Sequence, residues 1–374
     1  MSAFLMQAER SLKMAKETAK IVGSQEDYQR LGLSDTIQIR EDALRTTGQK
    51  GEYEWWYYDA KMNDGSTLVV TFFSNNPTDN AAGFHPSVKV ELTRADGTEV
   101  ADMVSYPAES CSFSKDRCSV QIGDNRFEGD LHEYHIVIKT EKIEADITLT
   151  RSVPSWRPQT GHVFFGDKKY FAWLPSVPEG ETHAQVLVAG KAETHDGVGY
   201  HDHNWGNAPM MNVLHHWYWG RAKIGPYTVI SCYLTSTKKY GYTHLPIFML
   251  AKGDKLICDD ASKVQFSQLN PTLSKETGKH YHEKLVYEYE GDEGHFRITY
   301  HVNSMLTSFS LLADQGVDPT KFQKLMLRCM DLDPTYDRFS GTATLERIEN
   351  GVVTEAYDAP AVWEMMYFHL DRDV

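Results

Sequence analysis

From Gly51 onward, short apolar and β-branched runs alternate with polar positions and end at turn signals. Residues 54–60 are followed by Asn63-Asp64-Gly65 and then by residues 66–73, which is the pattern of a β-hairpin. The same pattern predicts further strands, at residues 87–94, 98–104, 119–123, 133–140, 144–152, 227–235, 247–251, 255–258, 285–290, 296–302, 340–347 and 362–370. Strands at this spacing predict an all-β chain of antiparallel β-sandwich or β-barrel domains.

The lead-in before Gly51 has a different pattern. Residues 1–23 carry charges inside an apolar periodicity, which predicts an amphipathic helix and argues against a signal peptide. Residues 24–50 are polar and irregular, with a helical turn expected near 25–31. A second helical segment is expected in the polar stretch 318–331, and no apolar window reaches the length of a membrane span.

An internal repeat divides the chain. Residues 55–73 (WWYYDAKMNDGSTLVVTFF) align with residues 217–234 (WYWGRAKIGPYTVISCYL), and a weaker match pairs residues 190–192 with 341–343. A length of 374 residues also suits two domains of roughly 150 to 170 residues. We therefore predict tandem copies of one β-domain. The predicted parts are an N-terminal helix with lead-in (1–50), a first β-domain (51–212) and a second β-domain (213–374).

Composition narrows the possible partners. A formal net charge of −14 argues against nucleic acid and anionic membrane surfaces, which both require basic patches. Five cysteines without a CxxC pair suggest a reducing, cytoplasmic environment. Aromatic residues make up 12% of the chain, which favours an aromatic-lined pocket for a hydrophobic small molecule. The sequence predicts no integral membrane segment and does not define an oligomeric state.

The densest group of chemically active residues lies at 197–206, which reads GVGYHDHNWG. On a regular strand His201, His203 and Trp205 share one face, and Tyr200, Asp202 and Asn204 share the other. Asp202 and His203 are therefore rivals for a cavity position, unless a bulge at the flanking glycines brings both faces together. A second dense patch follows at 215–221 (HHWYWGR).

Three interpretations of this group remain open. His201 and His203 have the spacing of two metal ligands, but a third ligand would have to come from a residue such as His85, Glu54 or His216. Alternatively, the polar groups satisfy backbone groups at a domain junction. We favour general acid–base chemistry in an apolar pocket, where burial raises the pKa of a carboxyl group. We therefore predict neither a metal nor a cofactor.

Residues outside this group complete the predicted site. Glu54 and Glu364 lie beside aromatic residues and could act as neutral acids that protonate an alkene or a leaving hydroxyl, or each could pair with Arg221 or a nearby lysine. The aromatic rings are either core residues or cavity walls, and ring faces stabilise a full cation by about 0.5 to 2 kcal/mol. The aromatic candidates are Trp55, Trp56, Tyr57, Trp217, Tyr218, Trp219 and Tyr233.

Three blocks carry a family resemblance. Residues 199–206 (GYHDHNWG) resemble the signature of the carotenoid 1,2-hydratase (hydroxyneurosporene synthase) and AttH-like family. Residues 54–58 (EWWYY) resemble its N-terminal signature, and residues 217–221 (WYWGR) with 224–227 (IGPY) resemble the opening of its second domain. Kievitone hydratase is similar in the same places, and the fungal Diels–Alderases share the shorter patterns.

The resemblance implies two lipocalin-like β-barrel domains with a pocket near their interface and cofactor-free chemistry on hydrophobic small molecules. It places the family's functional His-x-Trp pair on His203 and Trp205 and a functional Tyr on Tyr233. The carotenoid hydratases use an Asp two residues beyond that Tyr, where this chain has Thr235. The identity of the general acid is therefore left open.

The predicted function is a cofactor-free hydro-lyase, a hydratase or dehydratase, that acts on an isoprenoid or phenolic metabolite. A Diels–Alderase-type cyclase, coupled to dehydration through a quinone methide, is one alternative. A non-catalytic lipocalin-like carrier is another, although it would not need the His-Asp-His-Asn cluster. The predicted catalytic residues are His203, Asp202, Glu54 and His201, and the predicted substrate-binding residues are Trp205, Tyr200, Trp56, Trp217, Trp219, Arg221, Tyr233 and Glu364.

Overall fold

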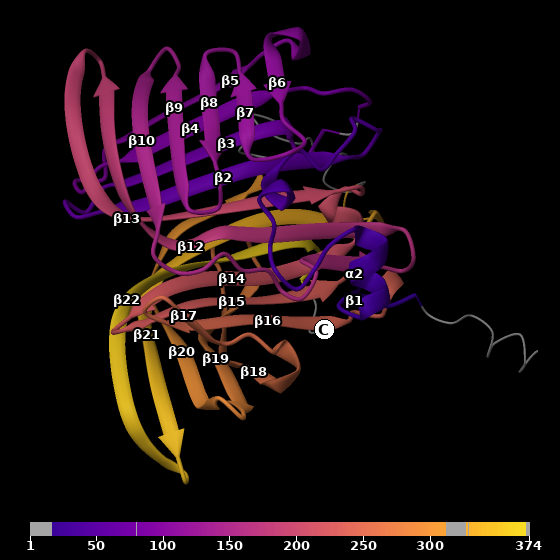
Figure 1. The fold of residues 1–374 in the computed structure, drawn as a ribbon. Helices are drawn as coiled ribbons and strands as arrows, with labels where there is room; N and C mark the ends of the chain where they lie inside the picture. Colours follow the sequence, from indigo (N-terminus) through magenta and orange to yellow (C-terminus); the bar gives the residue numbers. More distant parts are fainter. Residues whose placement is uncertain (1–16, 80, 312–326, 328, 372–374) are drawn as a thin grey trace, which may run out of the picture.

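The computed structural model describes residues 17–79, 81–311, 327 and 329–371. These residues form two curled antiparallel sheets, one above the other in Figure 1, and thus confirm the predicted all-β architecture with two domains. Within the described ranges, no helix is both long and apolar enough to cross a membrane.

The first sheet contains thirteen strands from the first half of the chain. They are β1 (Ala19–Ile21), β2 (Tyr53–Met62), β3 (Thr67–Asn75), β4 (Ser87–Thr93), β5 (Glu99–Ser105), β6 (Cys111–Phe113), β7 (Ser119–Ile122), β8 (Asn125–Gly129), β9 (Glu133–Lys139), β10 (Ile143–Arg151), β11 (His162–Phe165), β12 (Lys169–Val188) and β13 (Lys191–Gly206). The short helices of this half are α2 (Gln25–Leu31), η1 (Ile39–Asp42) and η2 (Ala108–Ser110).

The second sheet contains nine strands. They are β14 (Leu214–Ile224), β15 (Tyr227–Ser236), β16 (His244–Lys252), β17 (Lys255–Cys258), β18 (Val264–Leu273), β19 (His280–Gly291), β20 (Gly294–Ser310), β21 (Leu332–Glu349) and β22 (Val352–His369). Short 3-10 helices lie at η3 (Met210–Asn212), η4 (Lys238–Tyr240) and η5 (Ala261–Lys263). The chain passes from one sheet to the other between Gly206 and Leu214; the three predicted domain boundaries themselves stay a prediction.

The strand order bears out the internal repeat. The first sheet runs β5-β4-β3-β2-β13-β12-β10-β9-β8 through its centre, and the second runs β17-β16-β15-β14-β22-β21-β20-β19-β18. The hairpin β2–β3 therefore occupies the same place as β14–β15, as the stronger sequence match predicts. The weaker match is wrong, because Lys191 opens β13 whereas Gly341 lies inside β21, the counterpart of β12.

The structure tests several of the local predictions. The helical turn near 25–31 is confirmed as α2, which Ser24 caps at its start and Gly32 (φ 66°) ends. The predicted N-terminal helix is wrong for Ala19–Ile21, which pairs with β11 as strand β1; residues 1–16 lie outside the described residues. Most of the predicted segment 318–331 also lies outside them. The sequence prediction missed strands β12 and β18 entirely.

Strand β13 runs between β2 and β12 and is regular along β2. Ten consecutive residues, from Gly197 to Gly206, pair with β2 without a register shift. The bulges lie in β12 instead, around Val177. The two faces of β13 therefore stay separate, as alternation predicts: one points into the first barrel and the other toward the second domain.

The glycines of β13 provide close backbone contacts rather than flexibility. A Cβ atom on Gly197 would lie 2.3 Å from the carbonyl oxygen of Lys61 and 2.7 Å from the Cα of Met62. Gly197→Ala should therefore destabilise the protein by about 1 to 3 kcal/mol, because backbone atoms must move. Urea unfolding checks this expectation. The neighbouring exposed Val198→Ala serves as the control, and an equal effect of the two substitutions would contradict it.

Candidate functional site

The lead-in closes the interior of the first barrel through Asp42, at the end of η1. Its carboxylate accepts a hydrogen bond of 2.5 Å from the Tyr134 hydroxyl and one of 3.1 Å from His201 Nε2. His203 Nδ1 lies 3.3 Å from its other oxygen. Asp42, His201 and His203 are all buried. A single carboxylate from the lead-in thus accepts hydrogen bonds from two side chains inside the barrel and lies within ion-pair distance of a third.

Glu54 binds Arg45 and Thr46, the next part of the lead-in, beside His203 in the first barrel. Its carboxylate accepts hydrogen bonds from the backbone N–H groups of Arg45 (2.7 Å) and Thr46 (2.9 Å) and from the Thr46 hydroxyl. His203 Nε2 lies 2.7 Å from the same carboxylate. Both oxygens of Glu54 are therefore occupied by donors within the domain, and the side chain is fully buried.

The opposite charges in this cluster shift the pKa values of Asp42 and His203 in the directions that favour their charged forms. Burial alone would raise the pKa of Asp42, but the charge and hydrogen bonds of His201 and His203 outweigh it and hold that pKa well below its ordinary value. Burial alone would lower the pKa of His203, but its hydrogen bonds with Asp42 and Glu54 raise it. His203 thus lies between two carboxylates that raise its pKa, and its ring stacks on Trp56 at 4.6 Å.

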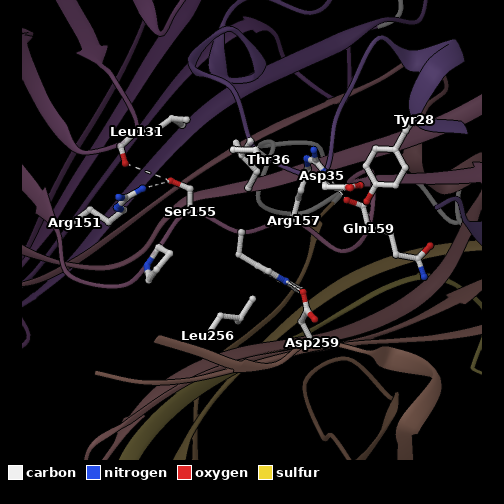
Figure 2. Close-up of a pocket in the computed structure, with 13 residues that line it drawn as sticks. Tyr28, Asp35, Thr36, Leu131, Arg151, Ser155, Arg157, Gln159, Leu256 and Asp259 are labelled. Carbon is white, nitrogen blue, oxygen red and sulfur yellow. Dashed lines mark hydrogen bonds between the residues drawn. The ribbon is translucent and has the colours of Figure 1, made fainter. Parts of the chain in front are cut away.

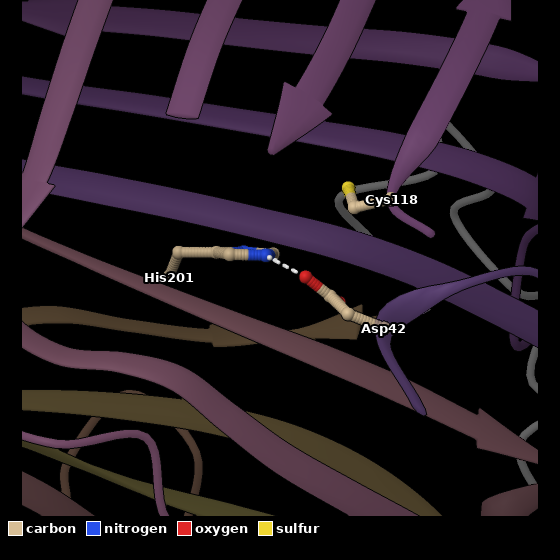
Figure 3. A group of neighbouring side chains, drawn as sticks. All are labelled: Asp42, Cys118 and His201. Carbon is tan, nitrogen blue, oxygen red and sulfur yellow. Dashed lines mark hydrogen bonds and ion pairs between the residues drawn. The ribbon is translucent and has the colours of Figure 1, made fainter. Parts of the chain in front are cut away.

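Asp42, Cys118 and His201 also form a group with metal-ligand chemistry (Figure 3). Their ligand atoms lie within 4.8 Å of one another. The His201–Asp42 hydrogen bond already uses one atom of each residue, and burial, followed by the charge of Asp42, raises the pKa of the Cys118 thiol well above its ordinary value. A metal requires the thiolate. The donor set therefore fits a hydrogen-bonded cage around Asp42 better than a metal centre.

The opposite face of β13 presents Asp202 to the second domain. Asp202 accepts hydrogen bonds from Trp173 Nε1 (2.7 Å), from the Tyr200 hydroxyl (2.8 Å) and from Asn204 Nδ2 (2.7 Å). Burial raises the pKa of Asp202, and the hydrogen bonds offset this rise only in part. Asp202 is therefore a carboxyl group that holds its proton more tightly than an exposed aspartate.

A second carboxyl with a raised pKa lies in the second domain. Glu364 of β22 accepts a hydrogen bond of 3.0 Å from Trp217 Nε1 and one of 2.8 Å from the Tyr336 hydroxyl. Burial raises the pKa of Glu364, whereas these two donors and the charge of Arg338 lower it in smaller measure. The side chains of Glu364 and Tyr336 are only half-buried.

These residues meet across the domain junction. Arg221 of β14 forms an ion pair with Asp59 of β2 and lies 4.9 Å from the centre of the Tyr200 ring. Trp219 contacts the same ring at 5.7 Å. Burial lowers the pKa of Arg221 to about 10. We call this set the interdomain face, and its members are Tyr57, Tyr200 and Asp202 of the first domain and Trp217, Trp219, Arg221, Tyr336, Arg338 and Glu364 of the second.

The predicted site residues therefore separate into distinct places. The interdomain face brings together six of them: Asp202, Tyr200, Trp217, Trp219, Arg221 and Glu364. His201, His203, Glu54 and Trp56 lie inside the first barrel, and Trp205 packs with Ala172 and Leu174 at its edge. Tyr233 lies in the second barrel, stacked on Phe266 at 4.0 Å. The described structure thus does not join Tyr233 to the His203–Trp205 pair.

Sequence reasoning missed Asp42, Trp173, Tyr336 and Arg338. Arg338 has only a partial signal. Asn350-Gly351 forms the tip of the hairpin β21–β22, and continuing its first antiparallel pairs would set Asp337 opposite Glu364; a register shift between Arg347 and Ile348 places Arg338 there instead. No comparable local signal identifies Asp42, which meets His201 over a separation of 159 residues.

Comparison with known proteins identifies relatives of the chain. Hydroxyneurosporene dehydrogenase of Chlorobaculum tepidum is 27% identical over 224 residues, which cover 50% of this chain and 58% of that protein. The quinolone epoxide rearrangement protein asqO of Emericella nidulans is 24% identical over 224 residues, 55% of this chain and 60% of that protein. The chain therefore matches a little over half the length of these relatives.

Solved structures agree on the fold. Kievitone hydratase from Nectria haematococca superposes with a TM-score of 0.54 at 13% identity, covering 94% of this chain and 97% of that one. This likeness confirms the predicted lipocalin-like fold. The Diels-Alderase-like family model matches residues 34–289, more than half of the chain. The match includes the lead-in from η1, all of β13 and the first strands of the second domain. The chain belongs to the Diels-Alderase-like family.

Proposed function

We propose that the protein is a hydro-lyase that adds water to, or removes it from, a hydrophobic isoprenoid or phenolic small molecule at the interdomain face. The observation that carries this proposal is the pair Asp202 and Glu364. Each is a carboxyl group with a raised pKa, each comes from a different domain, and aromatic rings surround both. Carboxyl groups of this kind deliver protons at near-neutral pH.

The geometry suggests different roles for the two carboxyls. Glu364 is half-buried, so a substrate between the domains can reach it, and in its neutral form it donates a proton to an alkene or a leaving hydroxyl. Asp202 is 6% exposed and three donors occupy it, so it orients the Tyr200 hydroxyl and Trp173 rather than meeting the substrate. The rings of Trp217 and Trp219 stabilise the cation that forms, and the Glu364 carboxylate then accepts the proton released by the adding water or, in dehydration, by the neighbouring carbon.

The proposal changes the role of the histidines. His201 and His203 lie with Glu54 inside the first barrel, where Asp42 covers them. We propose that these three residues fix β13, and with it Asp202, in place. Their predicted part in proton transfer stays a prediction that kinetics on the variants must decide.

Mass spectrometry after incubation in oxygen-18 water tests the reaction type. We expect prenylated phenols or acyclic isoprenoids to gain one solvent oxygen in the hydration direction. In the dehydration direction, we expect the hydroxylated analogues to lose the mass of water. Turnover of these compounds without any gain, loss or exchange of oxygen would overturn the hydro-lyase proposal.

A cyclase is the second candidate, and the family match favours it. A dehydration at Glu364 would generate a reactive diene, and the two domains would hold it in register for cycloaddition, where orientation supplies much of the rate. In that case the product is isomeric with the dehydrated intermediate and carries a new ring. Nuclear magnetic resonance of the product distinguishes this outcome from simple loss of water.

A further inference from the structure

A separate cavity lies at another part of the domain seam (Figure 2). It has a volume of about 380 Å³, within the range of about 300 to 1,000 Å³ that is usual for small-molecule sites. The lead-in contributes Tyr28 and Thr36, the segment after β10 contributes Trp156, and the second domain contributes Leu256 and Asp259. No member of the interdomain face lines it.

The wall of this seam cavity is partly apolar and partly polar. Leu131, Pro154 and Trp156 of the first domain face Leu256 of the second. The Trp156 indole N–H donates a hydrogen bond of 3.0 Å to Asp259, which links the two domains beside the cavity. An apolar body of about the size of one ring, lying against these side chains, would contact both domains.

Two arginines line the cavity, and only one is neutralised. Arg157 forms a buried ion pair of 2.8 Å with Glu41 and donates one hydrogen bond to each of the backbone carbonyls of Ser34 and Gln159. Arg151 donates one hydrogen bond of 2.9 Å, to the Ser155 hydroxyl. Among the residues that the structure describes, no carboxylate oxygen lies within 4.0 Å of an Arg151 nitrogen. Arg151 thus keeps an unneutralised positive charge at the cavity wall.

Asp259 adds a titratable group at the floor. Desolvation raises its pKa, and the hydrogen bond from Trp156 offsets part of that rise. A protonated Asp259 would donate to an anionic group, whereas an ionised Asp259 would repel it. Asp35, which also lines the cavity, adds a second carboxyl, so the unneutralised Arg151 is the group that favours an anion, and protonation of Asp259 at lower pH strengthens that preference.

We propose that the seam cavity binds a small organic acid: one carboxylate paired with the Arg151 guanidinium, and one ring-sized apolar body against Trp156 and Leu256. A planar carboxylate matches the fork of guanidinium N–H donors. Such a ligand would bridge the lead-in, the first domain and the second domain, so it would act on how the domains are held together rather than on the interdomain face. This site is independent of the proposed hydro-lyase activity.

Isothermal titration calorimetry of the full chain with trans-cinnamate tests the proposal. We expect binding of one cinnamate per chain and a loss of affinity of at least tenfold in Arg151→Met, which keeps an unbranched apolar side chain and removes the guanidinium charge. Arg151→Lys should retain part of the affinity. Arg126→Met, an exposed arginine on β8, is the matched control and should bind like the wild type.

A second probe separates charge from shape. Cinnamamide has the same outline without the carboxylate and should bind at least tenfold more weakly than cinnamate. Equal binding of the two compounds, unchanged binding in a folded Arg151→Met, or no heat of binding up to about 10 mM cinnamate would each overturn the proposal. Circular dichroism establishes that the variant is folded, so loss of binding cannot be mistaken for unfolding.

Discussion

Asp42→Ala is expected to lower the free energy of unfolding by about 3 to 5 kcal/mol, the usual cost of removing one partner from a buried ionic network. The substitution removes the carboxylate that pairs with His203 and that accepts hydrogen bonds from His201 and the Tyr134 hydroxyl. It also releases η1 from the first barrel. Urea unfolding followed by tryptophan fluorescence measures the loss.

The pKa shifts set the sign of the pH dependence. The pKa of Asp42 is lowered from its ordinary value of 3.8, so its contribution is present above pH 3.8 and is lost as the pH falls further. The pKa of His203 is raised from 6.5, so its contribution is present below pH 6.5 and is lost as the pH rises through the folded-state value. The difference between wild type and variant should therefore be largest between pH 3.8 and 6.5.

A surface pair provides the matched control. Asp146 lies 3.0 Å from His135, and both side chains are about half exposed. Asp146→Ala should cost less than about 1 kcal/mol, because exposed ion pairs contribute little. Similar losses for Asp42→Ala and Asp146→Ala would mean that the lead-in does not close the first barrel as described.

Glu364→Gln is expected to lower kcat by about 10² to 10⁴-fold, the usual contribution of a general acid. Glutamine preserves the shape and can still accept a hydrogen bond from Tyr336 or Trp217, so the fold should survive. The measurement is steady-state turnover of whichever compound the oxygen-18 experiment identifies, together with a melting curve of the variant.

The pH profile tests the same role by another route. Because burial raises the pKa of Glu364 above its ordinary value of 4.5, the active, protonated form persists to higher pH, and kcat should fall as the pH rises through the raised pKa. Glu355→Gln on the same strand is the control, since its carboxyl pairs with Arg347 and lies outside the interdomain face. A Glu364→Gln variant with wild-type kcat would exclude Glu364 as the acid.

The fold was largely predictable because its signals are local. Turn residues such as Asn63-Asp64-Gly65 mark hairpins, and alternation along 200–205 correctly separates the two faces of β13. The repeat then places β14–β15 where β2–β3 lies in the first copy. These properties depend on residues that are close in sequence, so a single sequence is enough to find them.

The candidate site was predictable only in part, because its pairings are distant. Alternation places Asp202 and His203 on opposite faces of β13, but it does not predict which face is closed off by another segment. The residue that closes the histidine face is Asp42, which is far away in the sequence, in the lead-in. The family resemblance favoured the histidine face and Tyr233, whereas the proposed site has Asp202 on the other face and Glu364 in the second domain. Burial, which decides those pKa values, appears only when both domains are assembled.

The lead-in has a consequence for the order in which the protein folds. Asp42 forms its hydrogen bond with His201, which is 159 residues later in the sequence. The backbone N–H of Ala19 donates to the Thr243 hydroxyl across a separation of 224 residues. Contacts of such long range form slowly, since a large loop must close before they contribute. At a synthesis rate of roughly 5 to 20 residues per second, these early residues remain without partners for about ten seconds or more. The lead-in is synthesised before the strands that it contacts, yet it is thus among the last segments to be fixed, and its docking completes both the first barrel and the seam.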